Sequence, residues 1–419
     1  MGGRARRRGA PWLAALAVGL LGCGRDAGPA PTGPLAGVRL AVSMSLAEEE
    51  QDAVRALLAR FERETGARVT LVSVAAADLP DKLRVDVGAG RPTIDLFAQD
   101  NLGLRALVDD RLVEDLSDVA LPPEVTARLV PPRFDGRQYF LPFRPNVQVT
   151  YANRDRFARA GAAPPRTVEE LRAVARVLKA AGRGTGKVTL PLDAGAGAAV
   201  TVAEWVVAFG GDPLVLDGPG AVAALEALQD LWREGLLARE SLLAKFDTQV
   251  DFLQGETAWL APNWPFTSTV FAEQDILDRF IVYEGWRGPV RAAHVIGGDV
   301  LGIPRGVTGR RREGAVALAR FLMGREAQQR LVERNAWPAI REDAYAAVPA
   351  ALAETFAAIR RALADGFYRP AVPYWPDVTD AMNEAIRRCL ERGEPVRPVL
   401  AALGARVREA ARRTEAARR

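Results

Sequence analysis

The side chains that most often carry out chemistry in enzymes are scarce in this chain. It has one histidine, His294, and two cysteines, Cys23 and Cys389, among 419 residues. A zinc cage needs about four histidine, cysteine or carboxylate ligands, so we expect no metal site of the histidine- and cysteine-rich kind. A Ser-His-Asp triad would have to use His294, and no Gly-x-Ser-x-Gly motif accompanies it. We therefore expect a structural role for His294.

Two glycine-rich segments superficially resemble cofactor-binding loops. In the segment 182–187, the first glycine of a phosphate loop would fall at Ala181, and Val188 replaces the Ser or Thr that binds the metal ion. The Gly195-Ala196-Gly197 segment lacks the third glycine of a dinucleotide fingerprint, because Val200 stands there. We expect no cofactor.

Charged residues are numerous but nearly balanced in sign. The chain has 56 basic and 52 acidic residues, so we expect no nucleic-acid partner. Carboxylates are abundant enough for a secreted glycoside hydrolase, which needs two of them about 5–9.5 Å apart. No spacing in the sequence singles out such a pair of carboxylates. Glycoside hydrolysis is therefore retained only as an alternative function.

Hydrogen-bonding side chains lie beside several predicted strands. Because ligands of open α/β sheets bind outside the carboxyl ends of the strands, we expect these side chains to contact a small solute. Carboxylates would accept hydrogen bonds from hydroxyl groups of the solute, and the guanidinium of Arg144 would donate hydrogen bonds to its oxygens. A structural or solvated role is the alternative for each residue. The set is Ser43, Ser45, Gln99, Asp100, Asn101, Arg144, Asn146 and Asp299.

Predicted strands and helices alternate along the chain. A strand over 38–43 is followed by a helix over 47–64, with apolar residues at Val54, Leu57, Leu58 and Phe61, and by a strand over 67–74. Such strand-helix-strand units build parallel sheets. Further on, the sequence predicts a helix that begins after Thr167 and strands over 147–151, 257–260 and 296–303. The pattern is that of an α/β protein without internal repeats.

The amino terminus has the pattern of an export signal. Arg4, Arg6, Arg7 and Arg8 precede a short apolar stretch over 12–21, which is too short for a membrane span of about 20 residues. The segment ends in Leu20-Leu21-Gly22-Cys23, which resembles the processing box of bacterial lipoproteins. The resemblance implies a signal over 1–23, a lipid on the sulfur of Cys23 and a flexible tether over 24–36. It also implies an extracytoplasmic protein that is anchored to a bacterial membrane.

A series of short motifs after the tether resembles the family 1 extracellular solute-binding proteins of ABC importers, the group that includes maltose- and oligosaccharide-binding proteins. The motifs occur in the family's order over nearly the whole body of the chain. They are the segments 61–66, 92–96, 135–142, 151–155, 164–171, 252–258, 297–303 and 317–328, followed by Trp337-Pro338.

This resemblance implies a periplasmic-binding-protein type II-like fold, with two α/β lobes, a hinge and a ligand cleft between the lobes. Lobe 1 would hold 37–148 and 296–336, and lobe 2 would hold 149–295 and 337–419. The implied function is capture of a small solute by closure of the hinge, with delivery to the permease subunits of the ABC transporter. The expected solute is a sugar or oligosaccharide. We expect a monomer that is not an enzyme. Polyamines and phosphate esters are the alternative solutes.

Aromatic residues are the expected stacking surfaces for a sugar, whose C–H faces pack against planar rings. Trp264 and Trp375 occupy positions that resemble stacking residues of the family, and the adjacent Asn263 and Tyr374 are expected to contact the ligand as well. Trp205 and Trp337 are further candidates. Core packing is the alternative for all four tryptophans. The Gly297-Gly298 pair suits either a bending hinge or an ordinary turn.

Overall fold

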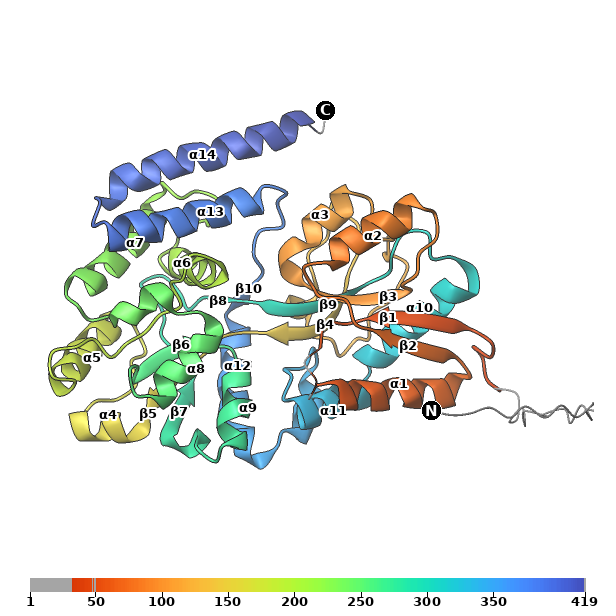
Figure 1. Cartoon of the computed structure of the whole chain (residues 1–419), viewed down its shortest axis with the longest axis horizontal. Helices are drawn as coiled ribbons and strands as arrows, with labels where there is room; N and C mark the ends of the chain where they lie inside the picture. The colour runs from red at the N-terminus through yellow and green to blue at the C-terminus, as the bar shows by residue number, and fades with distance from the viewer. Residues whose placement is uncertain (1–31, 47, 49, 418–419) are drawn as a thin grey trace, which may run out of the picture.

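Two bodies lie side by side in the computed structural model, joined by extended segments (Figure 1). The structure describes residues 32–46, 48 and 50–417, so the predicted signal and Cys23 lie outside the described part. At the described end of the predicted tether, Leu35 is buried, and its N–H donates to the carbonyl oxygen of Thr65.

The elements follow one another in the alternating order that the sequence predicts. The strands are β1 (Arg39–Ser43), β2 (Arg68–Val72), β3 (Leu96–Asp100), β4 (Leu141–Asn146), β5 (Val149–Asn153), β6 (Leu260–Asn263), β7 (Phe280–Tyr283), β8 (His294–Val295), β9 (Gly297–Gly302) and β10 (Gly366–Phe367). The α-helices are α1 (Gln51–Thr65), α2 (Leu79–Gly88), α3 (Leu104–Asp109), α4 (Arg154–Ala160), α5 (Val168–Ala181), α6 (Ala196–Ala208), α7 (Pro219–Arg233), α8 (Phe246–Gln254), α9 (Phe266–Glu273), α10 (Gly309–Met323), α11 (Arg325–Asn335), α12 (Ala353–Ala364), α13 (Trp375–Ile386) and α14 (Val396–Ala417).

The first body, which we call lobe 1, is built on a five-stranded sheet in the order β2-β1-β3-β9-β4. Strands β1, β2 and β3 are parallel, whereas β9 runs antiparallel to both β3 and β4. Helices α1, α10 and α11 contribute to the apolar core on one face, and α2 and α3 to that on the other. The mixed sheet is therefore buried on both faces, as expected where helices connect its parallel strands.

The second body, lobe 2, is built on the antiparallel sheet β6-β5-β7. Helices α5, α6, α7, α13 and α14 contribute to the core on one face, and α8, α9 and α12 to the core on the other. A short parallel pair, β10 with β8, lies beside α6 (Figure 1).

Three segments pass between the lobes. Val147 and Gln148 join β4 to β5, Ile296 joins β8 to β9, and residues 336–352 join α11 to α12. The amide of Asn101, at the end of β3, donates from Nδ2 to the Ile296 carbonyl oxygen at 3.0 Å. Lobe 1 is thus hydrogen-bonded directly to one of the crossing segments.

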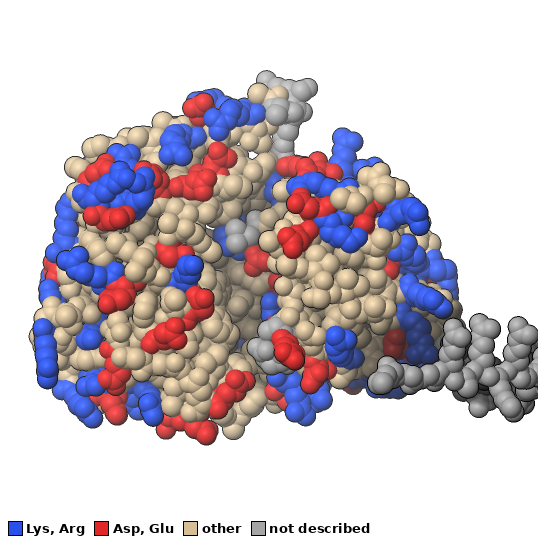
Figure 2. Space-filling view, in the orientation of Figure 1, with Lys and Arg blue, Asp and Glu red and all other residues tan. Residues whose placement is uncertain are grey.

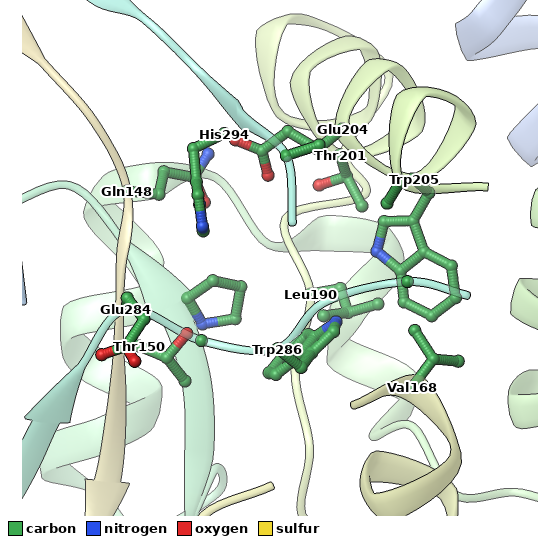
Figure 3. A pocket seen from close by; sticks show the side chains of 15 residues that line it. Gln148, Thr150, Val168, Leu190, Thr201, Glu204, Trp205, Glu284, Trp286 and His294 are labelled. Atoms are coloured by element: carbon green, nitrogen blue, oxygen red, sulfur yellow. The ribbon is translucent and has the colours of Figure 1, made fainter. Parts of the chain in front are cut away.

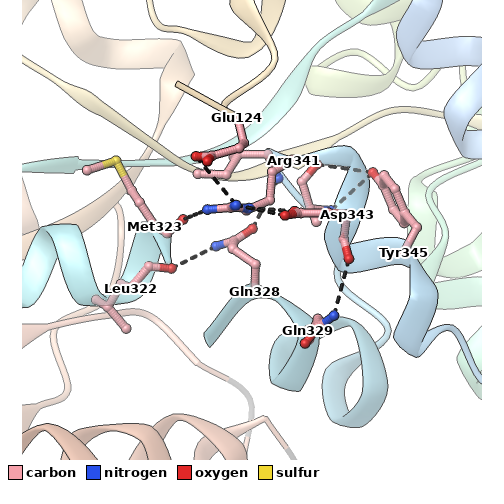
Figure 4. A network of polar contacts seen from close by, with 10 residues as sticks. Glu124, Leu322, Met323, Gln328, Gln329, Arg341, Asp343 and Tyr345 are labelled. Atoms are coloured by element: carbon pink, nitrogen blue, oxygen red, sulfur yellow. Dashed lines mark hydrogen bonds and ion pairs between the residues drawn. The ribbon is translucent and has the colours of Figure 1, made fainter. Parts of the chain in front are cut away.

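The third crossing segment is fixed by a polar network around the buried Arg341 (Figure 4). Its guanidinium contacts both carboxylate oxygens of Asp343, at 2.6 and 2.8 Å, and lies 3.5 Å from Glu124. The amide oxygen of Gln328 accepts from the Ile340 N–H at 3.0 Å. Since buried polar groups are costly unless paired, this network holds the segment where it leaves lobe 1.

Local sequence signals explain several boundaries. Helix α1 buries Val54, Leu57, Leu58 and Phe61, the residues that the helical period predicts. The helix ends at Gly66, whose φ of 75° is readily adopted only by glycine. None of the described helices is both long and apolar enough to span a membrane.

One predicted strand is displaced along the chain. We expected a strand over 257–260, but β6 spans Leu260–Asn263. The ladder with β5 begins where Ala152 lies opposite Leu260. Just before it, the carbonyl oxygen of Trp259 accepts from the Asn153 N–H of β5, while the N–H of Trp259 donates to the carbonyl of Lys187. The strand boundary is therefore set by backbone partners from other segments and not by the local run of residues.

Candidate functional site

A hollow lies between the two lobes, and acidic and basic side chains are visible in it (Figure 2). We refer to this hollow as the groove. Two polar clusters and one tryptophan lie near the crossing segments.

The first polar cluster joins neighbouring strands of lobe 1. Arg144 on β4 lies opposite Asp299 on β9 in the strand register, and its guanidinium is 2.7 Å from the carboxylate. The same guanidinium is 3.2 Å from Glu50, at the start of α1. Burial raises the pKa of Asp299, although Arg144 opposes this effect. The cluster brings together two of the residues predicted from the sequence, with opposite charges paired.

Trp337 completes this cluster from the third crossing segment. Its Nε1 donates to the Glu50 carboxylate at 2.8 Å, and the Arg144 guanidinium carbon lies 4.2 Å from its ring centroid. Only 5% of Trp337 is exposed, and its ring packs edge-on against Phe143. Trp337 therefore positions the charged groups, because both its face and its N–H are already in use.

The second polar cluster surrounds Arg369, in the segment after β10. Its guanidinium donates to the side-chain oxygen of Asn101 at 2.7 Å and lies 3.4 Å from Asp100. Burial lowers the pKa of Arg369, while the Asp100 charge opposes the change. Asp100 and Asn101, both predicted from the end of β3, are thus linked to the lobe 2 chain.

Trp264 lies where lobe 2 meets the crossing segments. The tryptophan is half-buried, and its ring packs so closely on Gly297 that a β-carbon there would lie 2.9 Å from the ring. Asn263 is fully buried: its Nδ2 donates to the Phe246 carbonyl and to Thr267, and its Oδ1 accepts from the Trp264 N–H. Asn263 therefore sets the direction of Trp264.

The other predicted aromatic residues lie deeper in lobe 2. Trp375 is 4% exposed and belongs to the apolar core, whereas the adjacent Tyr374 is half-buried. Burial raises the pKa of Tyr374. Trp205 is 5% exposed and stacks on Phe209, with ring centroids 6.0 Å apart. Of these aromatic rings, Tyr374 keeps the most accessible surface.

The remaining predicted residues are small polar groups at strand ends in lobe 1. Ser43 is buried, Ser45 is exposed, and Gln99 is buried with its Nε2 donating to the Ala76 carbonyl at 3.1 Å. Asn146 is half-buried, and its Oδ1 accepts from the Val147 N–H. Ser45 and Asn146 therefore have the most surface available to a ligand within this group.

Sequence reasoning missed Glu50 and Arg369. Neither residue belongs to a recognisable motif, and each reaches its own cluster from a distant part of the chain. Glu50 is 94 residues from Arg144 in the first cluster, and Arg369 is 269 residues from Asp100 in the second. Among the described residues, no group of histidine, cysteine and acidic side chains is arranged to hold a metal ion.

Comparison with known proteins decides the family. A model of the bacterial extracellular solute-binding protein family matches residues 56–358. The chain belongs to this family. The predicted family is confirmed, and with it the predicted class of function: a solute-binding protein rather than an enzyme.

Solved structures similar to this solute-binding protein confirm the predicted α/β periplasmic-binding-protein fold. Maltose-bound MalE3 of T. maritima has a TM-score of 0.72 at 21% identity, covering 88% of this chain and 99% of that one. The cyclic alpha-maltosyl-1,6-maltose binding protein of Arthrobacter globiformis has a TM-score of 0.78 at 20% identity, covering 89% and 98%. For the sugar-binding protein MalE of Xanthomonas citri the TM-score is 0.77 at 17% identity, covering 91% and 100%. No curated protein sequence matches the chain significantly.

Proposed function

We propose that this solute-binding protein captures a neutral sugar or oligosaccharide in the groove between its lobes and delivers it to the permease of an ABC transporter. The similar solved structures include a maltose-bound protein and a binding protein for cyclic alpha-maltosyl-1,6-maltose.

The observation that carries the proposal is the pairing of charges in the groove. Arg144 is paired with Glu50 and Asp299, and Arg369 with Asp100. A polyamine site would need several carboxylates free of cationic partners, and a phosphate-ester site would need an arginine fork that is still available. The buried Nε atoms of Arg144 and Arg369 have no hydrogen-bond partner in the described structure, but each arginine charge is paired with a carboxylate. A groove whose charges are paired in this way favours an uncharged ligand with many hydroxyl groups.

Trp264 supplies the apolar surface that such a ligand needs. An aromatic ring binds the C–H face of a sugar while neighbouring polar groups receive its hydroxyls. We propose Trp264 and Tyr374 as the contact surfaces from lobe 2 and Ser45, Asp100, Asn146 and Asp299 as the hydrogen-bonding groups from lobe 1. Asn263, Arg144 and Trp337 would act by holding these groups in place.

Closure of the groove would proceed by bending of the crossing segments, with 37–148 and 296–336 as one moving body and 149–295 and 337–419 as the other. A ligand that touches both lobes favours the closed state by its extra contacts there. Gly298 has a φ of 89°, a conformation that suits a glycine at a bend.

The amino-terminal segment supports a further part of the proposal. Leu20-Leu21-Gly22-Cys23 after an arginine-rich, apolar stretch would direct export and place a lipid on Cys23. The mature protein would then face the outside of a bacterial membrane, next to the permease. Metabolic labelling with a fatty acid, compared between the parent and Cys23→Ala, tests this step.

Ligand binding is tested by calorimetry and thermal shift with maltose and a maltodextrin, alongside spermidine and glycerol 3-phosphate. We expect only the sugars to raise the melting temperature, because ligands stabilise the state to which they bind. Stabilisation by spermidine or glycerol 3-phosphate alone would overturn the neutral-ligand argument, and release of shorter sugars would indicate hydrolysis.

The stacking role is tested by Trp264→Ala. We expect sugar affinity to fall roughly 30-fold, which corresponds to the loss of about 2 kcal/mol typical of an aromatic anchor. Trp232→Ala is the matched control, because Trp232 is also half-buried but lies on α7. Equal losses in both variants, or none in Trp264→Ala, would contradict the assignment.

A further inference from the structure

Lobe 2 contains a separate small pocket between α6, the beginning of β5 and the segment that follows β7, and water-sized groups can enter about 40 Å³ of it (Figure 3). None of its lining residues belongs to the two polar clusters of the groove. Of the residues predicted from the sequence, only Trp205 lines it.

The pocket contains a buried polar group that has no partner. Gln148 is 3% exposed, and within the described structure its Nε2 makes no hydrogen bond. A buried donor without a partner costs about 1–3 kcal/mol. Since Gln148 lines the pocket, an occupant that accepts a hydrogen bond would remove this cost.

Burial disfavours the charged form of two titratable side chains of the pocket. Burial raises the pKa of Glu204 to about 8, although its carboxylate accepts from the Val295 N–H at 2.8 Å. Burial lowers the pKa of His294 to about 4, against the opposing charges of Asp365 and Glu284 and with the Arg291 charge acting in the same direction. A protonated carboxyl and a neutral imidazole can each donate and accept hydrogen bonds.

The charge of the one ionised group at the pocket is already balanced. Glu284 lines the pocket, and its carboxylate is paired with Arg166 at 2.6 Å and with Arg361 at 2.8 Å. These arginines hold the pKa of Glu284 below its ordinary value, against the effect of burial. The pocket therefore presents no uncompensated charge to an occupant.

Two indole rings supply the apolar wall. Figure 3 shows Trp205 and Trp286 on one side of the pocket and Gln148, His294 and Glu204 across from them. A small hydroxylated ring has an apolar face that packs against flat aromatic rings, and hydroxyl groups that need hydrogen-bond donors and acceptors. The pocket offers both kinds of surface.

We propose that this pocket is a second binding site, independent of the groove, for a small, neutral, hydroxylated ring. The ring would pack against the indoles of Trp205 and Trp286, and its hydroxyls would accept from Gln148 Nε2 and exchange hydrogen bonds with Glu204 and His294. Occupancy at this site does not depend on the function proposed for the groove.

Fluorine NMR of protein labelled with 5-fluorotryptophan tests the proposal at the residues concerned. The signals of Trp205, Trp286 and Trp264 are assigned by Trp→Phe substitutions, and D-glucose and myo-inositol are the probes. We expect at least one probe to shift the Trp205 and Trp286 signals in a saturable way, and to do so equally in Trp264→Ala. Shifts confined to Trp264, or abolished by Trp264→Ala, would overturn the proposal.

Gln148→Met provides the second arm, because it removes the unpaired amide and keeps the side-chain length. We expect about a tenfold loss of probe affinity together with a melting temperature equal to or above that of the parent. Thr150→Val, at another buried pocket residue, repeats the test should Gln148→Met fold poorly. Unchanged affinity in the folded variants would refute the site.

Discussion

Replacing Glu204 by glutamine should change how the stability of the protein depends on pH. The folded-state pKa of Glu204 is raised to about 8 from an ordinary value of 4.5, because the carboxyl is buried. Between these two values the folded protein binds more protons than the unfolded chain does. Stability is therefore full below pH 4.5 and is lost as the pH rises through about 8.

The size of the effect follows from the same two values. A pKa difference of this size corresponds to at most about 5 kcal/mol at 1.36 kcal/mol for each pH unit. Glutamine resembles the protonated carboxyl in shape and cannot ionise. Glu204→Gln should therefore match the parent near the acid end of the range and become increasingly more stable than it toward alkaline pH.

Urea unfolding at several values from about pH 5 to about pH 9 measures this difference directly. The exposed Glu169→Gln on α5 is the control for removing a carboxylate from the surface, and its stability should run parallel to that of the parent. Parallel curves for Glu204→Gln and the parent would refute the reasoning, because they would mean that Glu204 ionises at its ordinary pKa.

Two further predictions concern lobe 1. Trp337→Phe keeps an aromatic ring beneath the Arg144 guanidinium but removes the indole N–H that donates to Glu50 at 2.8 Å. We expect the free energy of unfolding, measured with urea, to fall by about 1.5–3 kcal/mol, as for hydrogen bonds to charged groups. An unchanged unfolding free energy would show that this hydrogen bond contributes nothing. Gly298 and Gly136 both have positive φ, at 89° and 78°, but a β-carbon at position 298 would lie 2.0 Å from a carbonyl oxygen, whereas position 136 is open. Gly136→Ala should cost about 1–2 kcal/mol from backbone strain alone, and Gly298→Ala clearly more; equal melting temperatures for the two variants would contradict the clash.

Much of the fold could be predicted because its signals are local. The apolar positions of α1 repeat at the helical period, and Thr167 caps α5 by accepting from the Glu170 N–H at 3.1 Å. Such patterns depend on residues three or four apart in the chain. The displacement of β6 has the opposite origin, because strand boundaries depend on a partner that is distant in sequence.

The groove was only partly predictable for the same reason. Arg144 and Asp299 were identified separately, from the rule that ligands bind near strand ends, and the antiparallel register of β4 and β9 then placed them together. Their partner Glu50 reaches the pair from the start of α1, and no local pattern announces it. The role of a charged residue in an ion-pair cluster can be recognised only when its spatial neighbours are known.

By itself, the sequence determined the alternation of strands and helices, the family motifs and the scarcity of histidine and cysteine, which argues against a catalytic triad or a metal cage. Tertiary structure alone decided which tryptophans keep accessible surface, which charges neutralise one another and where an unpaired amide borders a pocket. The physical reason is that burial and pairing are properties of the space around a side chain, and that space is filled by residues from distant parts of the chain.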